Sequence, residues 1–177
     1  LNFLPMKIID NFLSDSDFDF VQKFFLSTDL PWFWSNGISG KEQGLDHFQF
    51  VYKFFDTKNP FQNCQAVKYS NFLQPILNKI SPDHLLRIKA NLRPRTSSHI
   101  ISEWHTDMKL NQKTAIFYLN TNNGYTLFKD DSKVYSLANR LCLFNGHTEH
   151  AGASCTDERR RIVLNINYIP GELDPLR

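Results

Sequence analysis

The chain has 177 residues, of which 41% are hydrophobic and 21% are charged, and its formal net charge is +2. This length suits one ordinary domain with a buried core, so we expect a single domain over residues 1–177. The small net charge argues against a nucleic acid or an anionic membrane as a partner. No apolar run approaches the roughly 18 residues that span a bilayer. The oligomeric state stays open.

The beginning of the chain, LNFLPMKIID, lacks the charged and apolar regions of a signal peptide. Three cysteines, Cys64, Cys142 and Cys155, lie far apart in the sequence. Their odd number and wide spacing indicate neither a disulfide framework nor a CxxC metal site. Buried thiols in a reducing compartment are the simplest interpretation, and we therefore expect a cytoplasmic protein.

The first half of the chain predicts two helices. Over residues 14–28, Ser14 or Asp15 can cap a helix whose apolar residues recur at helical spacing. Residues 66–80 show the same period, and Pro75 should kink that helix or mark a new first turn. Aromatic and β-branched residues between the helices predict strands over 32–35 and 48–55.

The second half of the chain reads as short strands separated by turn residues such as Asn145-Gly146. The expected strands cover residues 85–93, 99–105, 113–120, 125–129, 139–145 and 161–169. Two helices followed by many evenly spaced strands predict an α+β fold, a double-sheet jelly roll backed by N-terminal helices. In this division residues 1–84 give the helical support with flanking strands, and residues 85–169 give the jelly-roll core.

The clearest local signal for chemistry is the tripeptide His105-Thr106-Asp107 at the end of a predicted strand. Residues two apart in an extended chain face the same side, so this imidazole and this carboxylate can reach one ion. His150 can supply a third ligand from a distant part of the chain. Two histidines and one carboxylate on one side of a metal, with the other positions open, is typical of non-haem Fe(II) oxygenases. An HxD tripeptide alone is common by chance, so the hypothesis depends on the order and content of the downstream segments.

Three segments downstream of this tripeptide resemble the 2-oxoglutarate/Fe(II)-dependent oxygenase superfamily, and within it the prolyl 4-hydroxylase-like branch. TAIFYLN at 114–120 is similar to the branch's characteristic strand, and GYTLF at 124–128 occupies the place of the next strand. NRLCLFNGHTEH at 139–150 resembles the stretch that leads to the distal histidine. The resemblance covers roughly residues 85–169 and implies a double-stranded β-helix that uses Fe(II), 2-oxoglutarate and O₂.

The implied metal ligands and catalytic centre are His105, Asp107 and His150. His147 lies only three residues before His150. We prefer His150 because the small Ala151-Gly152 pair after it fits the family's pattern and lets a cosubstrate approach closely. His147 is better placed in a turn.

The resemblance also implies a fixed cation for the distant carboxylate of 2-oxoglutarate, and arginine suits that role. Strand parity favours Arg161 over its neighbour Arg160, because Arg161 shares a face with Val163, Asn165 and Asn167. That polar face should line the barrel mouth, while Ile162, Leu164 and Ile166 should pack into the core.

Three further residues are candidates for cosubstrate binding. Tyr118 matches a position where the family's prolyl hydroxylases direct a tyrosine hydroxyl at 2-oxoglutarate, although a strand aromatic is often a core residue. Arg93 could have a secondary cosubstrate or substrate role. The branch often carries tyrosine at that place, and Asn91, which shares the parity of Arg93, is an equal rival.

The resemblance implies a dioxygenase that hydroxylates an aliphatic C–H and releases succinate and CO₂. A prolyl residue of a peptide or protein is the favoured substrate, and a free amino acid or other small molecule is the alternative. A rival from another class is a non-catalytic, cupin-like metal-binding jelly roll, which has no need of a buried strand arginine. The glycine-spaced loop 36–46 could be a lid over the mouth or a plain surface connection.

Overall fold

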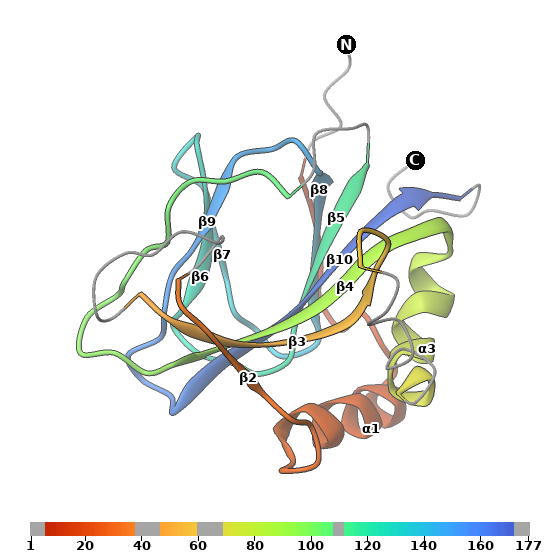
Figure 1. Cartoon of the computed structure of the whole chain (residues 1–177), viewed down its shortest axis with the longest axis horizontal. Coiled ribbons are helices and arrows are strands. Elements are labelled where there is room, and N and C mark those ends of the chain that lie inside the picture. The colour runs from red at the N-terminus through yellow and green to blue at the C-terminus, as the bar shows by residue number, and fades with distance from the viewer. Residues whose placement is uncertain (1–5, 38–46, 60–68, 108–111, 172–177) are drawn as a thin grey trace.

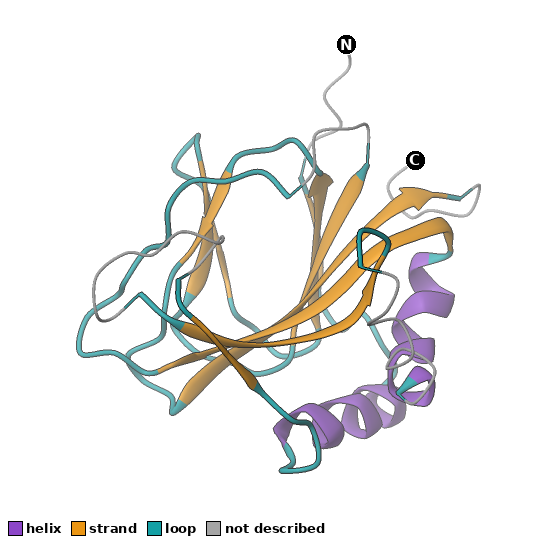
Figure 2. Cartoon of the chain, viewed as in Figure 1, coloured by secondary structure: helices purple, strands orange, loops and turns teal. Residues whose placement is uncertain are grey.

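The computed structural model describes residues 6–37, 47–59, 69–107 and 112–171. Two antiparallel sheets face each other, and two helices pack on the outside of the larger sheet (Figures 1 and 2). The predicted α+β jelly roll backed by helices is therefore confirmed. Most of loop 36–46 lies outside the described residues, so its role as a lid stays a prediction.

The larger sheet contains seven strands in the order β1 (Lys7–Ile9), β8 (Arg140–Asn145), β5 (Lys113–Tyr118), β10 (Arg160–Pro170), β4 (Pro82–Pro94), β3 (Gln49–Asp56) and β2 (Phe33–Ser35). The smaller sheet contains β7 (Lys133–Tyr135), β6 (Tyr125–Phe128) and β9 (His150–Gly152), in that order. In Figure 1 the smaller sheet lies opposite β5 and β10. This is the paired-sheet arrangement of a jelly roll.

Strand β10 is the centre of the larger sheet and divides its side chains between two environments. It pairs with β4 on one side and β5 on the other, with Arg161 opposite Arg93 and Val163 opposite Tyr118. Ile162 and its alternate neighbours are fully buried against the helices. Arg161, Val163 and Asn165 line the interior cavity, so the predicted sidedness holds for this part of the strand.

The helices cover the outer face of the larger sheet. Helix α1 (Asp15–Leu26) begins after Ser14, whose Oγ accepts a hydrogen bond from the Asp17 amide at 3.2 Å. Helix α3 (Ser70–Ile80) runs through Pro75, so the proline does not start a new helix. Apolar side chains of both helices join those of β3, β4, β5, β8 and β10 in one core. Within the described part of the chain, no helix is long and apolar enough to cross a membrane.

The strand predicted over 99–105 is wrong. That segment is irregular, and it pairs antiparallel with residues of and beside β9 through two isolated bridges, Ile101 with Ala153 and His105 with His150. Because the pairing is limited to these two bridges, the side chains of His105 and Asp107 are positioned by an irregular segment beside the edge strand β9. Sequence periodicity also missed the three-residue strands β1, β7 and β9, which are too short to show an alternating pattern.

Asn139 ties the start of α1 to the larger sheet. Its Oδ1 accepts from the Leu13 amide at 2.8 Å, and its Nδ2 donates to the Leu13 carbonyl at 2.9 Å. The residue is buried and has a φ of 63°. We expect Asn139→Ala to lower the free energy of unfolding by roughly 2–4 kcal/mol, because two buried backbone groups lose their partners.

The matched control is Asn11→Ala, which has a φ of 50° but an exposed side chain. Asn11→Ala should lower the free energy of unfolding by roughly 1 kcal/mol, because it places alanine in a left-handed backbone conformation without removing a buried hydrogen bond. Urea unfolding of both variants separates the two contributions, and equal losses would contradict the importance of the Leu13 hydrogen bonds.

Candidate active site

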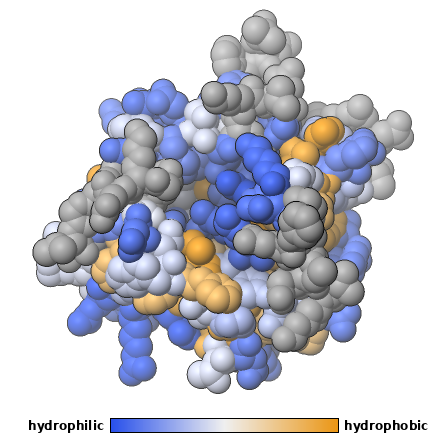
Figure 3. Space-filling model, in the orientation of Figure 1, coloured by the Kyte–Doolittle hydropathy of each residue, from blue (hydrophilic) through white to orange (hydrophobic). Residues whose placement is uncertain are grey.

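The interior between the two sheets holds a cavity of about 410 Å³. Its walls come from β3, β4 and β10 of the larger sheet, from β9, and from the loop that carries His105 and Asp107. Figure 3 shows hydrophilic side chains gathered in the middle of this face, over the region where β4 and β10 lie in Figure 1. A polar cavity of this size, lined from several strands, is suited to a small ligand.

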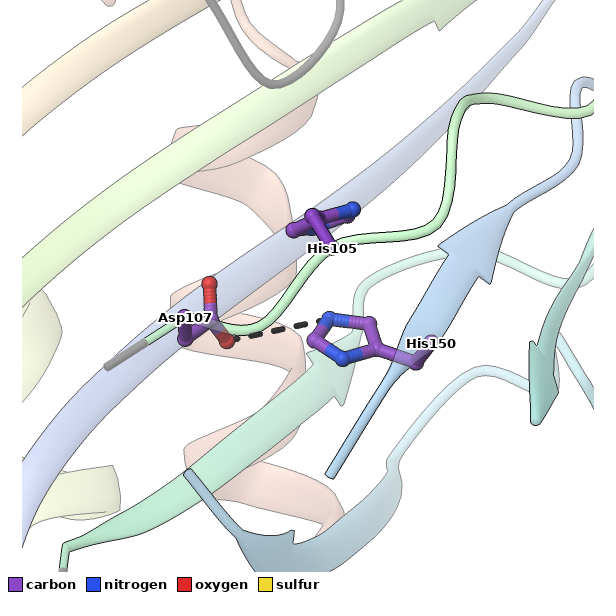
Figure 4. A group of neighbouring side chains, drawn as sticks. All are labelled: His105, Asp107 and His150. Atoms are coloured by element: carbon purple, nitrogen blue, oxygen red, sulfur yellow. Dashed lines mark ion pairs between the residues drawn. The ribbon is translucent and has the colours of Figure 1, made fainter. Parts of the chain in front are cut away.

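His105, Asp107 and His150 converge at this cavity (Figure 4). Their ligand atoms all lie within 4.8 Å of one another, and His150 Nε2 is 3.7 Å from Asp107 Oδ2. Reciprocal backbone hydrogen bonds of 3.1 and 3.0 Å join His105 to His150, and they hold the loop against β9. Residues from two distant parts of the chain thus form one group of three potential metal ligands.

The hydrogen bonds of the two imidazoles leave the correct nitrogen free for a metal. His105 Nδ1 lies 3.1 Å from the Glu103 carbonyl, and His150 Nδ1 lies 3.0 Å from the Thr148 carbonyl. A carbonyl oxygen only accepts, so each Nδ1 carries the proton and each Nε2 presents its lone pair. Backbone carbonyls that fix the tautomer in this way are typical of metal-binding histidines. Burial, with the neighbouring His150, also lowers the pKa of His105, which favours the neutral ligand form.

Asp107 is held ready as an anionic ligand. Arg87 donates to its Oδ1 at 2.7 Å and Asn165 Nδ2 donates to its Oδ2 at 3.1 Å. Burial alone would raise the pKa of this carboxyl, but His150 and Arg87 outweigh burial and hold the pKa well below its usual range. The donor set of two neutral imidazoles and one carboxylate fits a first-row divalent metal.

Arg161 lies deeper in the same cavity, and its side chain is only 4% exposed. Its Nε donates to Ser136 Oγ at 2.8 Å, and one terminal nitrogen donates to Thr126 Oγ1 at 3.2 Å. Among the described residues no carboxylate forms an ion pair with it, so burial lowers the pKa of this guanidinium. A buried cation that has only neutral partners is suited to an anionic ligand.

Gly124 makes room for this arginine. A Cβ at this position would lie 2.6 Å from Arg161 Cδ and 2.8 Å from Asn122 Oδ1. The glycine in the GYTLF segment is therefore required by the close approach of the arginine side chain.

Arg93, opposite Arg161 in the β4–β10 register, is also only 4% exposed. It donates to the Gly152 carbonyl at 2.6 Å and to the Ile100 carbonyl at 2.9 Å, and burial together with Arg161 lowers its pKa to about 10. Arg160 lies on the opposite side of β10, where it donates to the Leu26 carbonyl at the end of α1. The structure thus brings Arg161 and Arg93 to the cavity, and it places Arg160 against a helix.

The other candidates divide between the wall and the core. Asn91 lines the cavity, two residues from Arg93 on the same face of β4. Tyr118 is fully buried and is not among the lining residues. Its hydroxyl lies 2.8 Å from Thr126 Oγ1, and its ring centroid lies 5.6 Å from Arg161 Cζ. Tyr118 therefore contacts Thr126 and Arg161 beside the cavity, and the direct contact with 2-oxoglutarate that the sequence suggested stays a prediction.

Sequence reasoning missed the cationic residues that share the wall with Asn91 and Arg93. Arg87 and Lys89 line the cavity from β4, and Lys53 lines it from β3. The signal was present in the alternation of polar residues 87, 89, 91 and 93 with apolar residues along one strand. Strand parity, which selected Arg161 on β10, also selects Arg87 and Lys89 on β4.

Comparison with known proteins identifies the architecture. No protein-family model matches the sequence, and no curated protein sequence does. Solved structures do match. A prolyl hydroxylase from Trichoplax adhaerens, in complex with a hypoxia inducible factor oxygen degradation domain peptide fragment, gives a TM-score of 0.62 at 16% identity over 96% of this chain and 86% of that chain. A Pseudomonas putida prolyl-4-hydroxylase gives 0.58 at 13% identity over 96% and 94%.

The fold is the double-stranded β-helix of 2-oxoglutarate/Fe(II) oxygenases. The non-heme alpha ketoglutarate dependent epimerase SnoN from nogalamycin biosynthesis has it too, with a TM-score of 0.59 at 13% identity over 93% of this chain and 77% of that chain. Hydroxylases and an epimerase thus share this double-stranded β-helix, so the likeness fixes the architecture and leaves the reaction to be argued from the site.

Proposed function

We propose that this protein is an Fe(II)- and 2-oxoglutarate-dependent dioxygenase that hydroxylates an aliphatic C–H. The observation that carries this proposal is the pairing, in one cavity, of three preset metal ligands with a buried arginine that has no carboxylate partner among the described residues. His105, Asp107 and His150 would hold the iron, and Arg161 would bind the distant carboxylate of 2-oxoglutarate. When bound, these groups supply oxidative decarboxylation to succinate and CO₂ coupled to activation of O₂.

The residues of the chain have separate tasks in this scheme. Arg87 and Asn165 orient the Asp107 carboxylate, and the Glu103 and Thr148 carbonyls orient the imidazoles. A cupin-like binding protein needs the metal ligands but not Arg161, so the buried arginine favours the oxygenase over that rival.

The test is to add Fe(II) and then 2-oxoglutarate to the protein without oxygen. We expect the weak visible charge-transfer band of a chelated 2-oxoglutarate–iron complex, followed by succinate release when air is admitted. A well-folded protein that binds Fe(II) and gives no band would refute the proposal and favour a non-catalytic metal-binding protein.

The substrate class has two candidates. The likeness to a prolyl hydroxylase solved with a peptide fragment supports a prolyl residue of a peptide or protein. The cationic cavity wall instead favours a free amino acid or another small anionic molecule. A peptide library and a small-molecule library, each read by mass for the gain of one oxygen atom, distinguish these candidates.

Tyr118 offers a graded test of the cosubstrate pocket. We expect Tyr118→Phe to raise the KM for 2-oxoglutarate by about 3–10-fold, because Thr126, which accepts a hydrogen bond from Arg161, loses one buried hydrogen-bond partner worth about 1 kcal/mol. Iron binding should stay unchanged, since the hydroxyl contacts no metal ligand among the described residues. A rise of more than about 100-fold in this KM would instead indicate direct contact between the Tyr118 hydroxyl and the cosubstrate.

A further inference from the structure

The wall of the cavity formed by β4 is strongly basic. Arg87, Lys89 and Arg93 face the cavity from this strand, while the alternating residues Ile88 and Ala90 pack into the core. Lys53 faces the cavity from β3 and is the register partner of Lys89. Along β4, Lys89 lies between Arg87, which donates to the metal ligand Asp107, and Arg93, which lies opposite Arg161.

The two lysines differ from the arginines in their partners. Arg87 donates to Asp107, and Arg93 donates to two carbonyls. Neither Lys53 nor Lys89 has a hydrogen bond or an ion pair with any residue in the described ranges. Both are nevertheless partly buried. As far as the described part of the chain shows, their ammonium groups are thus available to a ligand.

Holding these cations together is unfavourable in the ligand-free protein. Burial, reinforced by the charges of Arg87 and Lys53 and only partly offset by Asp107 and Asp56, lowers the pKa of Lys89 to about 8. The lining includes five cationic side chains and two carboxylates. A divalent iron and a dianionic cosubstrate cancel each other, so they leave this excess of positive charge in place.

We propose that Lys89 and Lys53 bind an anionic group, a carboxylate or a phosphate, on the substrate that is hydroxylated. This inference rests on the proposed function and narrows it to a small anionic molecule, in preference to a neutral prolyl peptide. The lysines lie on the inner wall of a cavity of about 410 Å³, so the anionic group must enter the barrel together with the reacting C–H.

The experiment uses the full chain, loaded with Fe(II) without oxygen and saturated with 2-oxoglutarate, so that the metal and Arg161 are already occupied. Sodium sulfate is the probe, titrated against sodium chloride at equal ionic strength, and the melting temperature Tm is followed. We expect a saturable rise in Tm, because an anion that binds only the folded protein stabilises it. The general stabilisation by sulfate does not saturate and is common to all variants.

Variants assign the response to the lysine pair. Lys89→Met should raise the half-saturating sulfate concentration about 10-fold or more, as expected for loss of one charge-assisted hydrogen bond. Lys89→Arg, which keeps the charge, should restore most of the response. Lys7→Met is the matched control, because Lys7 is exposed on the edge strand β1 and should give the wild-type response.

A wild-type protein without a saturable response, or a Lys89→Met variant that responds like wild type, would overturn the proposal. Equal turnover of a neutral prolyl peptide by wild type and Lys89→Met would overturn it as well. Absence of the charge-transfer band would instead refute the proposed oxygenase function. In that case the same sulfate titration, carried out without 2-oxoglutarate, still tests anion binding by Lys89. Sodium acetate and methyl phosphate are then titrated in place of sulfate. The probe with the lower half-saturating concentration indicates whether the substrate carries a carboxylate or a phosphate.

Discussion

Replacing Asp107 with alanine is expected to abolish Fe(II) binding at micromolar metal and to lower turnover by at least about 10³-fold, equivalent to roughly 4 kcal/mol. Asp107 supplies the only carboxylate of the three-residue ligand group. Two neutral imidazoles would remain, and the loss of one ligand and of the anionic oxygen donor leaves too weak a site for Fe(II) at this concentration. Anaerobic metal titration and succinate formation measure the two losses independently.

Asp107→Ala also leaves the Arg87 guanidinium without its carboxylate, so the variant is expected to unfold at lower temperature. His105→Ala is therefore the companion variant. His105 is partly exposed, and the only hydrogen bond of its ring within the described ranges is to a backbone carbonyl, so its loss should leave the fold intact. If His105→Ala kept full iron affinity and turnover while the protein stayed folded, the ligand assignment would be wrong.

The fold could be predicted largely because the alternation of apolar and polar residues is strong in the long strands. In β10, the polar residues on one side and Ile162, Leu164 and Ile166 on the other indicated both the strand and its orientation. The capping serine of α1 was found from its side chain and the helical period after it. The three-residue strands β1, β7 and β9 carry too little alternation to be predicted, whereas the equally short β2 was found from its aromatic residues.

The site was harder to predict because tertiary contacts position half of it. The HxD segment was expected at the end of a strand, but it is a loop held to β9 by the backbone bonds between His105 and His150. Nothing local in the sequence encodes that pairing. Arg87 is likewise recognisable as the partner of Asp107 only when β4 and the loop are placed in space. The resemblance supplied the order of the motifs, and the structure supplied the groups that orient them.

Arg161→Met is expected to raise the KM for 2-oxoglutarate by about 10²-fold or more while leaving Fe(II) affinity unchanged, since a charge-assisted bidentate contact contributes roughly 3 kcal/mol. Methionine nearly preserves the volume of the side chain and removes a buried cation that has no carboxylate partner among the described residues. The ligand-free variant should therefore fold at least as stably as wild type. The charge-transfer titration gives the affinity directly.

Arg160→Met is the matched control, because it changes the adjacent residue on the opposite side of the same strand. The Arg160 guanidinium donates to the Leu26 carbonyl at the end of α1, so its loss should lower stability slightly and leave the KM for 2-oxoglutarate unchanged. Saturating 2-oxoglutarate should stabilise wild type and Arg160→Met by about 2.7 kcal/mol at 100 times the Kd, and Arg161→Met much less. If 2-oxoglutarate stabilised Arg161→Met more than Arg160→Met, the cosubstrate carboxylate would not be bound from the cavity face of β10. Its partner would then be sought among the cationic residues of β4, such as Arg93 and Lys89.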